Sequence, residues 1–72
     1  MKEFIDNLES MLELQPGTLQ ATTPLNGLKG WDSMAAVGFL ALADGVYGKS
    51  VSPAEIQKCQ TVADLARLVG QS

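Results

Sequence analysis

The sequence contains no histidine, and its only cysteine is Cys59. Without histidine, neither a Ser-His-Asp triad nor a Cys-His pair can be built. A single cysteine excludes an internal disulfide and a metal cluster made of cysteines. The eight carboxylates are scattered, and half of them lie within the first thirteen residues, which does not favour a paired acid/base site. These absences predict that the chain is not an enzyme.

Basic residues and long apolar runs are also scarce. Five Lys and Arg stand against eight Asp and Glu, for a net charge of -3. Since a nucleic-acid interface needs a basic face, we expect no nucleic-acid partner. No apolar run approaches the roughly 20 residues that span a bilayer, and the N-terminus does not resemble a signal peptide, so the cytoplasm is the expected compartment. A chain of 72 residues has room for one modest core, and we expect a single domain over residues 1–72 and a monomer.

Hydrophobic spacing predicts an amphipathic helix near residues 2–14. Phe4, Leu8, Met11 and Leu12 fall on one stripe of such a helix, while the acidic residues fall outside it. Pro16-Gly17 is a turn signal that should end the helix.

A second helix is predicted over residues 33–47. Asp32 has the side chain of an N-cap, the following run to Tyr47 contains no proline, and Gly48 stands where a helix commonly ends. This helix is apolar on nearly all sides, and a bundle of this size cannot enclose it completely, so part of its apolar surface should face outward. Gly38 and Gly45 suggest either close approach of another chain or of a substrate, or tight packing inside the domain.

Two capping signals predict the remaining helices. Ser52-Pro53-Ala54-Glu55 should open a short helix near 53–59, and Thr61-Val62-Ala63-Asp64 should open the last helix, near 61–70. The predicted fold is therefore all-α, a small four-helix bundle of three longer helices and one short helix. The predicted buried residues are Phe4, Leu8, Met11, Leu12, Val37, Ile56, Val62, Leu65 and Val69.

Residues 15–31 keep neither a helical nor a strand period and predict a long first loop. A loop of this length is unusual in a compact domain unless its own side chains pack. Leu19, Leu25, Leu28 and Trp31 are expected to hold it across the ends of the helices. Asn26-Gly27 is a turn signal, but its flanks do not alternate, so no hairpin is expected.

The order of these signals resembles the acyl and peptidyl carrier proteins over essentially the whole chain. The matching residues are Gly30-x-Asp32-Ser33-Met34, then Val37, Tyr47-Gly48 and Thr61-Val62. The resemblance implies that a transferase uses coenzyme A and Mg²⁺ to attach 4′-phosphopantetheine to Ser33. Asp32 would contribute to the metal site of the transferase, and Met34 would anchor the start of the second helix. The thiol of the arm would then hold an acyl or aminoacyl group as a thioester.

The implied partners are a phosphopantetheinyl transferase, a loading ligase for acyl or aminoacyl groups, and downstream acyl-transfer or synthase enzymes. Carriers of fatty-acid synthesis typically have several acidic residues on the second helix, whereas this helix has only Asp44. We therefore expect docking through apolar contact, with Trp31, Phe39 and Leu42 as candidate contacts, and a specialised pathway. The alternatives are a peptidyl or D-alanyl type of aminoacyl carrier, and a small helical interaction module without a prosthetic group.

Overall fold

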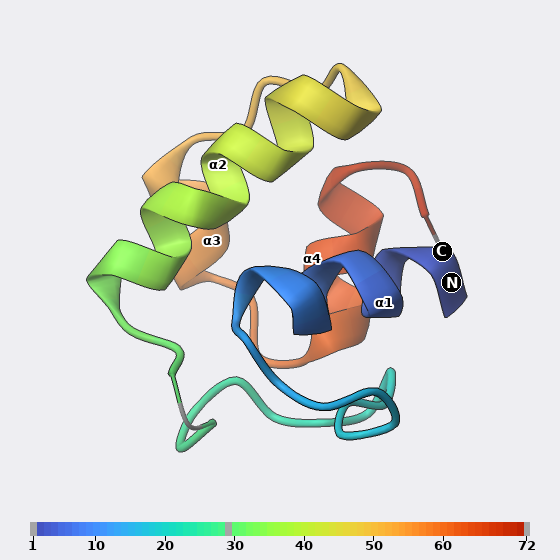
Figure 1. Cartoon of the computed structure of the whole chain (residues 1–72). Coiled ribbons are helices and arrows are strands. Elements are labelled where there is room, and N and C mark those ends of the chain that lie inside the picture. Colours follow the sequence, from blue (N-terminus) through green and yellow to red (C-terminus); the bar gives the residue numbers. More distant parts are fainter. Residues whose placement is uncertain (1, 29, 72) are drawn as a thin grey trace.

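The computed structural model describes residues 2–28 and 30–71, and Met1, Lys29 and Ser72 lie outside the described residues. The helices are α1 (Lys2–Met11), α2 (Ser33–Tyr47), α3 (Pro53–Gln57) and α4 (Val62–Leu68). Within the described residues there is no strand, only one isolated antiparallel bridge between Pro24 and Thr61. The predicted all-α fold with three longer helices and one short helix is confirmed. Figure 1 shows α2 crossing above α1 and α4, with the long first loop below them.

Helix α1 ends earlier than predicted, at Met11 rather than near residue 14. The chain leaves the helix through Glu13, a non-glycine residue with a positive φ of 58°. The Leu14 N–H donates to the Glu9 carbonyl at 2.8 Å and the Glu13 N–H to the Ser10 carbonyl at 3.2 Å, which is the Schellman pattern. The turn is therefore complete before Pro16-Gly17 is reached. Helices α3 and α4 are likewise shorter than the predicted 53–59 and 61–70.

Replacing Glu13 by glycine is expected to stabilise the protein slightly. A left-handed conformation costs an L-residue about 1–2 kcal/mol, and glycine avoids this cost. Glycine also has more conformational freedom in the unfolded chain, which offsets about 0.5–1 kcal/mol of the stabilisation. The control is Glu3→Gly, on an exposed position of α1, where glycine should destabilise by about 0.5–1 kcal/mol. Thermal or urea unfolding measures both variants, and a Glu13→Gly protein less stable than wild type would contradict the argument.

The core lies between α1, α2 and α4 and is closed by the first loop. The predicted residues Phe4, Leu8, Ile56, Val62, Leu65 and Val69 are buried, together with Leu19, Leu25, Phe39, Ala43 and Ala66. Met11 and Leu12 are only partly buried against this cluster. The prediction for Val37 is wrong, because 62% of this residue is exposed. A helix that is apolar on every side does not reveal its inner face, and Phe39 and Ala43 occupy it here.

All four aromatic residues of the sequence form one chain of ring contacts through the core. The ring centroids of Trp31 and Phe39 are 6.4 Å apart, those of Phe39 and Phe4 6.1 Å, and those of Phe4 and Tyr47 5.9 Å. The first two pairs meet edge to face, the arrangement that aromatic quadrupoles favour. These contacts connect the start of α2 to its end through α1.

The first loop packs as predicted. Leu19 and Leu25 are buried, while Leu28 and Trp31 are partly buried against the core. The backbone N–H of Leu19 donates to the buried carboxylate of Glu9 at 2.9 Å, which ties the loop to α1. The loop is therefore held by contacts with residues outside it, in α1 and in the core.

The same loop completes the start of α4. The carbonyls of Thr23 and Ala21 accept from the Val62 and Ala63 N–H groups at 3.1 and 2.9 Å, so the loop satisfies donors that the helix itself leaves unpaired.

Of the two glycines inside α2, Gly38 packs within the domain. A Cβ added to it would lie 3.4 Å from the Met11 sulfur, so this glycine lets α1 approach α2. A Cβ added to Gly45 would meet open space among the described residues, so packing inside the domain does not explain that glycine.

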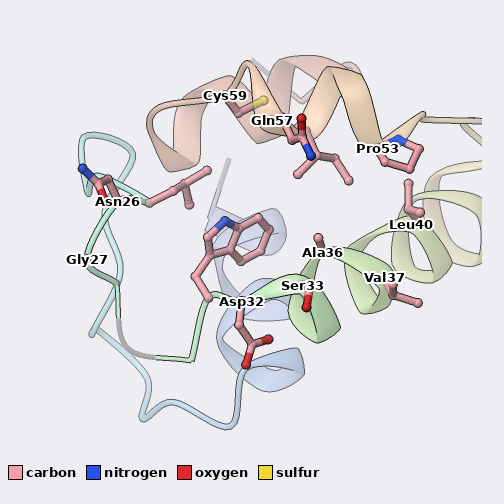
Figure 2. Close-up of a pocket in the computed structure, with 13 residues that line it drawn as sticks. Asn26, Gly27, Asp32, Ser33, Ala36, Val37, Leu40, Pro53, Gln57 and Cys59 are labelled. Carbon is pink, nitrogen blue, oxygen red and sulfur yellow. The ribbon is translucent and has the colours of Figure 1, made fainter.

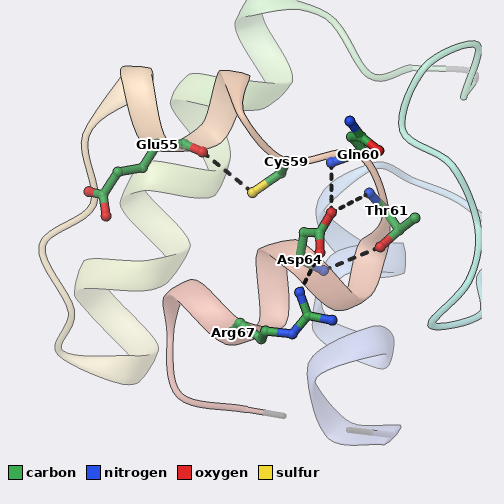
Figure 3. A network of polar contacts seen from close by, with 6 residues as sticks. All are labelled: Glu55, Cys59, Gln60, Thr61, Asp64 and Arg67. Carbon is green, nitrogen blue, oxygen red and sulfur yellow. Dashed lines mark hydrogen bonds and ion pairs between the residues drawn. The ribbon is translucent and has the colours of Figure 1, made fainter.

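A network of short-range contacts surrounds the start of α4 (Figure 3). The carboxylate of Asp64 accepts from the backbone N–H groups of Gln60 at 2.9 Å and Thr61 at 3.2 Å, while the Asp64 N–H donates to the Thr61 hydroxyl at 3.4 Å. The predicted capping box is therefore confirmed, with Asp in place of Glu. The two N–H donors, and after them the Arg67 guanidinium, hold the pKa of Asp64 below its ordinary value of 3.8.

This network should make part of the stability depend on pH. A carboxylate with a lowered pKa in the folded state stabilises the fold above its unfolded pKa, and that contribution is lost as pH falls through the folded pKa. Asp64→Asn is therefore expected to have a lower thermal midpoint than wild type at neutral pH, and the gap should narrow once the pH falls below the ordinary pKa of 3.8 and close below the folded pKa. Asp6→Asn, on the exposed side of α1, is the control. A gap that stays constant down to acid pH would show that the charge of Asp64 is unimportant.

Candidate functional site

Ser33 is the first residue of α2, and its position depends on Asp32. Asp32 is extended, with φ -136° and ψ -169°, and its Oδ1 accepts from the Ala35 N–H at 2.9 Å. Its carbonyl accepts from the Ala36 N–H at 3.0 Å, which begins the helical ladder. The predicted N-cap and helix start are both confirmed. Because Asp32 caps the helix, the cap does not require the Ser33 hydroxyl.

The other serine at a helix start is placed differently. Ser52 is itself the N-cap of α3, and its hydroxyl accepts from the Glu55 N–H at 3.3 Å and lies 3.2 Å from the Glu55 carboxylate. Ser33 is exposed, and no hydrogen bond to another described residue engages its hydroxyl. The N–H groups of a first helical turn favour a negative charge nearby. Of these two serines, only Ser33 combines an uncommitted hydroxyl with such a field.

A cleft of about 600 Å³ opens beside Ser33. Its lining comes from the first loop, the first two turns of α2, and α3 with the residues that follow it. Figure 2 shows Ser33 on the α2 side of this cleft, Asn26 on the loop, and Gln57 on the opposite wall. The lining residues are Leu25, Asn26, Gly27, Trp31, Asp32, Ser33, Ala36, Val37, Leu40, Pro53, Ile56, Gln57 and Cys59.

The structure corrects two of the predicted site residues. Met34 is 78% exposed and does not anchor the start of α2. Phe39 is fully buried between Trp31 and Phe4, so the prediction that it contacts partners is wrong. Leu42 and Trp31 are half-buried against the core and keep part of their surface exposed.

Exposed apolar surface on α2 is instead concentrated at positions that the sequence did not single out for docking. Val37, at 62% exposure, lies one turn from Met34 and also lines the cleft, while Val46, at 57%, lies near the other end of the helix. Asn26 and Gln57 were also missed as cleft residues. No sequence signal identified them, because the cleft forms only when the loop and α3 meet α2.

Cys59 lines the same cleft but has the character of a structural residue. Its thiol contacts the Glu55 carbonyl at 3.5 Å. Burial, followed by the charge of Asp64, raises the pKa of Cys59 above its ordinary value, which disfavours the reactive thiolate. Among the described residues, no group of His, Cys, Asp and Glu could hold a metal ion, and none of the helices is long and apolar enough to cross a membrane.

Comparison with known proteins identifies the family of the chain. No curated protein and no solved structure matches the chain significantly. The sequence model of the family described as "Phosphopantetheine attachment site" matches residues 2–69, which include all four helices and the first loop. The chain therefore belongs to the phosphopantetheine attachment site family, whose members are carrier proteins rather than catalysts and bear covalently attached 4′-phosphopantetheine.

Proposed function

We propose that the chain is a single-domain acyl carrier protein and that Ser33 bears the phosphopantetheine arm. The observation that carries this proposal is that the Ser33 residue is exposed at the start of α2. Its hydroxyl is not needed to cap the helix, because the Asp32 side chain makes the capping hydrogen bond. A phosphodiester at this hydroxyl would lie in the favourable field of the first helical turn. The residues present therefore fit the group that the family carries.

The residues of the chain supply attachment and presentation rather than chemistry. A phosphopantetheinyl transferase would join the Ser33 Oγ to the phosphate of the arm, and the serine proton and the adenosine bisphosphate part of coenzyme A would leave. Asp32, adjacent to the hydroxyl and exposed, is proposed to contribute to the Mg²⁺ site of the transferase. The bound arm supplies a thiol that carries the acyl group as a thioester.

The load is proposed to be an acyl group of a specialised pathway, with an aminoacyl group as the alternative. Asp44 is the only acidic residue of α2, so a partner that recognises acidic residues along this helix would find little to bind. The proposed partners beyond the transferase are a dedicated loading ligase and downstream acyl-transfer or synthase enzymes. A monomeric state and a cytoplasmic location remain predictions from the sequence.

The test is modification of the purified protein with coenzyme A, Mg²⁺ and a broad-specificity phosphopantetheinyl transferase. Intact-mass measurement should detect one phosphopantetheine per chain, and peptide mapping should locate it on Ser33. A protein that stays unmodified by several such transferases would favour the helical interaction module. The holo protein can then be offered to candidate ligases with fatty acids and with amino acids, which separates the acyl carrier from the aminoacyl carrier.

The docking surface on α2 gives a separate prediction. Val37→Asp, beside the proposed attachment site, should weaken association with the transferase. Val46→Asp, equal in chemistry and similar in exposure but at the far end of α2, is the matched control and should change association less. Because the surface is apolar, association of the wild type should depend only weakly on ionic strength. Surface plasmon resonance measures both effects, and a steep loss of on-rate with salt would instead point to the acidic residues of α1.

A further inference from the structure

We propose that Met34 is a modification site, at which a peroxide oxidises the thioether to the sulfoxide and makes the apo protein a poor substrate for the transferase. This inference rests on the proposed attachment at Ser33 and on the apolar docking surface beside it. It adds a reversible switch, in which an oxidant controls whether the carrier receives its arm.

The first argument is the exposure of the Met34 side chain. The sequence contains three methionines. Met34 is 78% exposed and does not pack against the core, whereas Met11 is partly buried there. The Met11 sulfur lies against α2, 3.4 Å from the place that a Cβ on Gly38 would occupy. Because a peroxide must reach the sulfur in order to oxidise it, Met34 should react faster than Met11.

The second argument is that the competing thiol is protected. Cys59 carries the only thiol of the apo protein and is half-buried. Its burial raises its pKa above the ordinary value, and the charge of Asp64 adds to this effect. Peroxides oxidise the thiolate rather than the thiol, so a raised pKa slows the reaction. Of the sulfur atoms in the described residues, that of Met34 is therefore the most open to a peroxide.

The reaction itself is a two-electron oxidation of the sulfur. A lone pair of the Met34 sulfur attacks one oxygen of hydrogen peroxide, and the O–O bond breaks. The departing hydroxide takes the proton of the transferred hydroxyl group, so the products are the sulfoxide and one water. The sulfoxide is polar and chiral, whereas the thioether is apolar. Methionine sulfoxide reductases restore the thioether, which makes the modification reversible.

The third argument is the place at which the new polar group would stand. Met34, Val37 and Ala41 are exposed and are spaced by three and four residues along α2. They form one apolar stripe that begins beside Ser33. An enzyme that covers this stripe would have to bury the sulfoxide oxygen without a hydrogen-bond donor, which opposes binding. Since Met34 does not pack against the core, its oxidation should leave the fold intact.

The experiment oxidises the apo protein alone and removes the peroxide with catalase before the transferase and coenzyme A are added. Intact mass should show the gain of one oxygen, and peptide mapping should locate it on Met34. We expect the KM of the transferase for the oxidised protein to rise by about tenfold, the effect of losing one well-covered apolar side chain. The thermal midpoint of the oxidised protein should equal that of the untreated protein, and methionine sulfoxide reductases A and B should restore both the mass and the KM.

Three variants separate oxidation of Met34 from other effects of peroxide. Met34→Leu keeps an apolar side chain but has no sulfur, so its KM should be the same before and after peroxide treatment. Met34→Gln places a polar side chain at the same position and should have a raised KM without any peroxide. Met11→Leu, on the partly buried side of α1, is the matched control and should respond to peroxide as the wild type does.

The outcomes distinguish this inference from the proposed function. An untreated apo protein that accepts no phosphopantetheine on Ser33 overturns the function and the inference together. A normally modified protein whose KM is unchanged after oxidation of Met34 overturns only the inference, as does oxidation that maps first to another residue. A peroxide effect that persists in Met34→Leu also overturns it, because another sulfur would then be responsible, and so does a lowered thermal midpoint, because partial unfolding would then explain the loss.

Discussion

Replacing Ser33 by alanine is expected to abolish phosphopantetheine attachment while leaving the fold intact. The substitution removes the hydroxyl oxygen that is proposed to form the phosphodiester, so the loss should be complete rather than graded. Alanine is a good helix former, and Asp32 rather than Ser33 makes the capping hydrogen bond, so stability should change by no more than about 0.5 kcal/mol. Intact mass after incubation with transferase and thermal unfolding by circular dichroism measure the two properties.

The matched control is Ser52→Ala, at the start of α3. Here the hydroxyl caps the helix, so its loss should cost about 1 kcal/mol of stability. Modification by the transferase should nevertheless remain complete. The two variants should therefore behave in opposite ways. Ser33→Ala should lose modification but keep its stability, whereas Ser52→Ala should lose stability but keep its modification. Residual modification of Ser33→Ala would mean that another hydroxyl bears the arm.

The largest expected loss of stability follows from Phe39→Ala. Phe39 is fully buried and joins the Trp31 and Phe4 rings, so its truncation removes two aromatic contacts and leaves a cavity. Such substitutions cost about 3–5 kcal/mol. Since small domains have roughly 5 kcal/mol of total stability, a large fraction of the molecules should be unfolded. Urea unfolding followed by circular dichroism measures the change in the free energy of unfolding.

Val37→Ala, on the same helix, is the control for this experiment. Its side chain is mostly exposed, so we expect a change within about 0.5 kcal/mol. Equal losses in the two variants would mean that α2 is rotated from the orientation described. Phe39→Asp is unsuitable for testing partner docking, because a charge at this fully buried position would unfold the protein.

Features that depend on neighbours in the chain could be predicted from the sequence. The caps at Asp32, Ser52 and Thr61 are made by residues three positions apart, and all were predicted. The bounds of α2 and the burial of Val62, Leu65 and Val69 in the last helix and its C-cap also follow from local pattern and spacing. The identity of the candidate attachment residue rests on the same local signals, together with the resemblance of the whole pattern to a family.

Features that depend on contacts between distant segments were decided only by the tertiary structure. The sequence of α2 is apolar on every side, and packing against α1 is what buries Phe39 and leaves Val37 exposed. Helix α1 ends at a left-handed Glu13 with two backbone hydrogen bonds around it. No glycine or proline stands at this position, so the sequence carries no signal for the end of the helix there. The cleft beside Ser33 forms where the first loop and α3 pack near the first two turns of α2. The spacing of residues along the chain does not reveal which distant side chains this packing brings together.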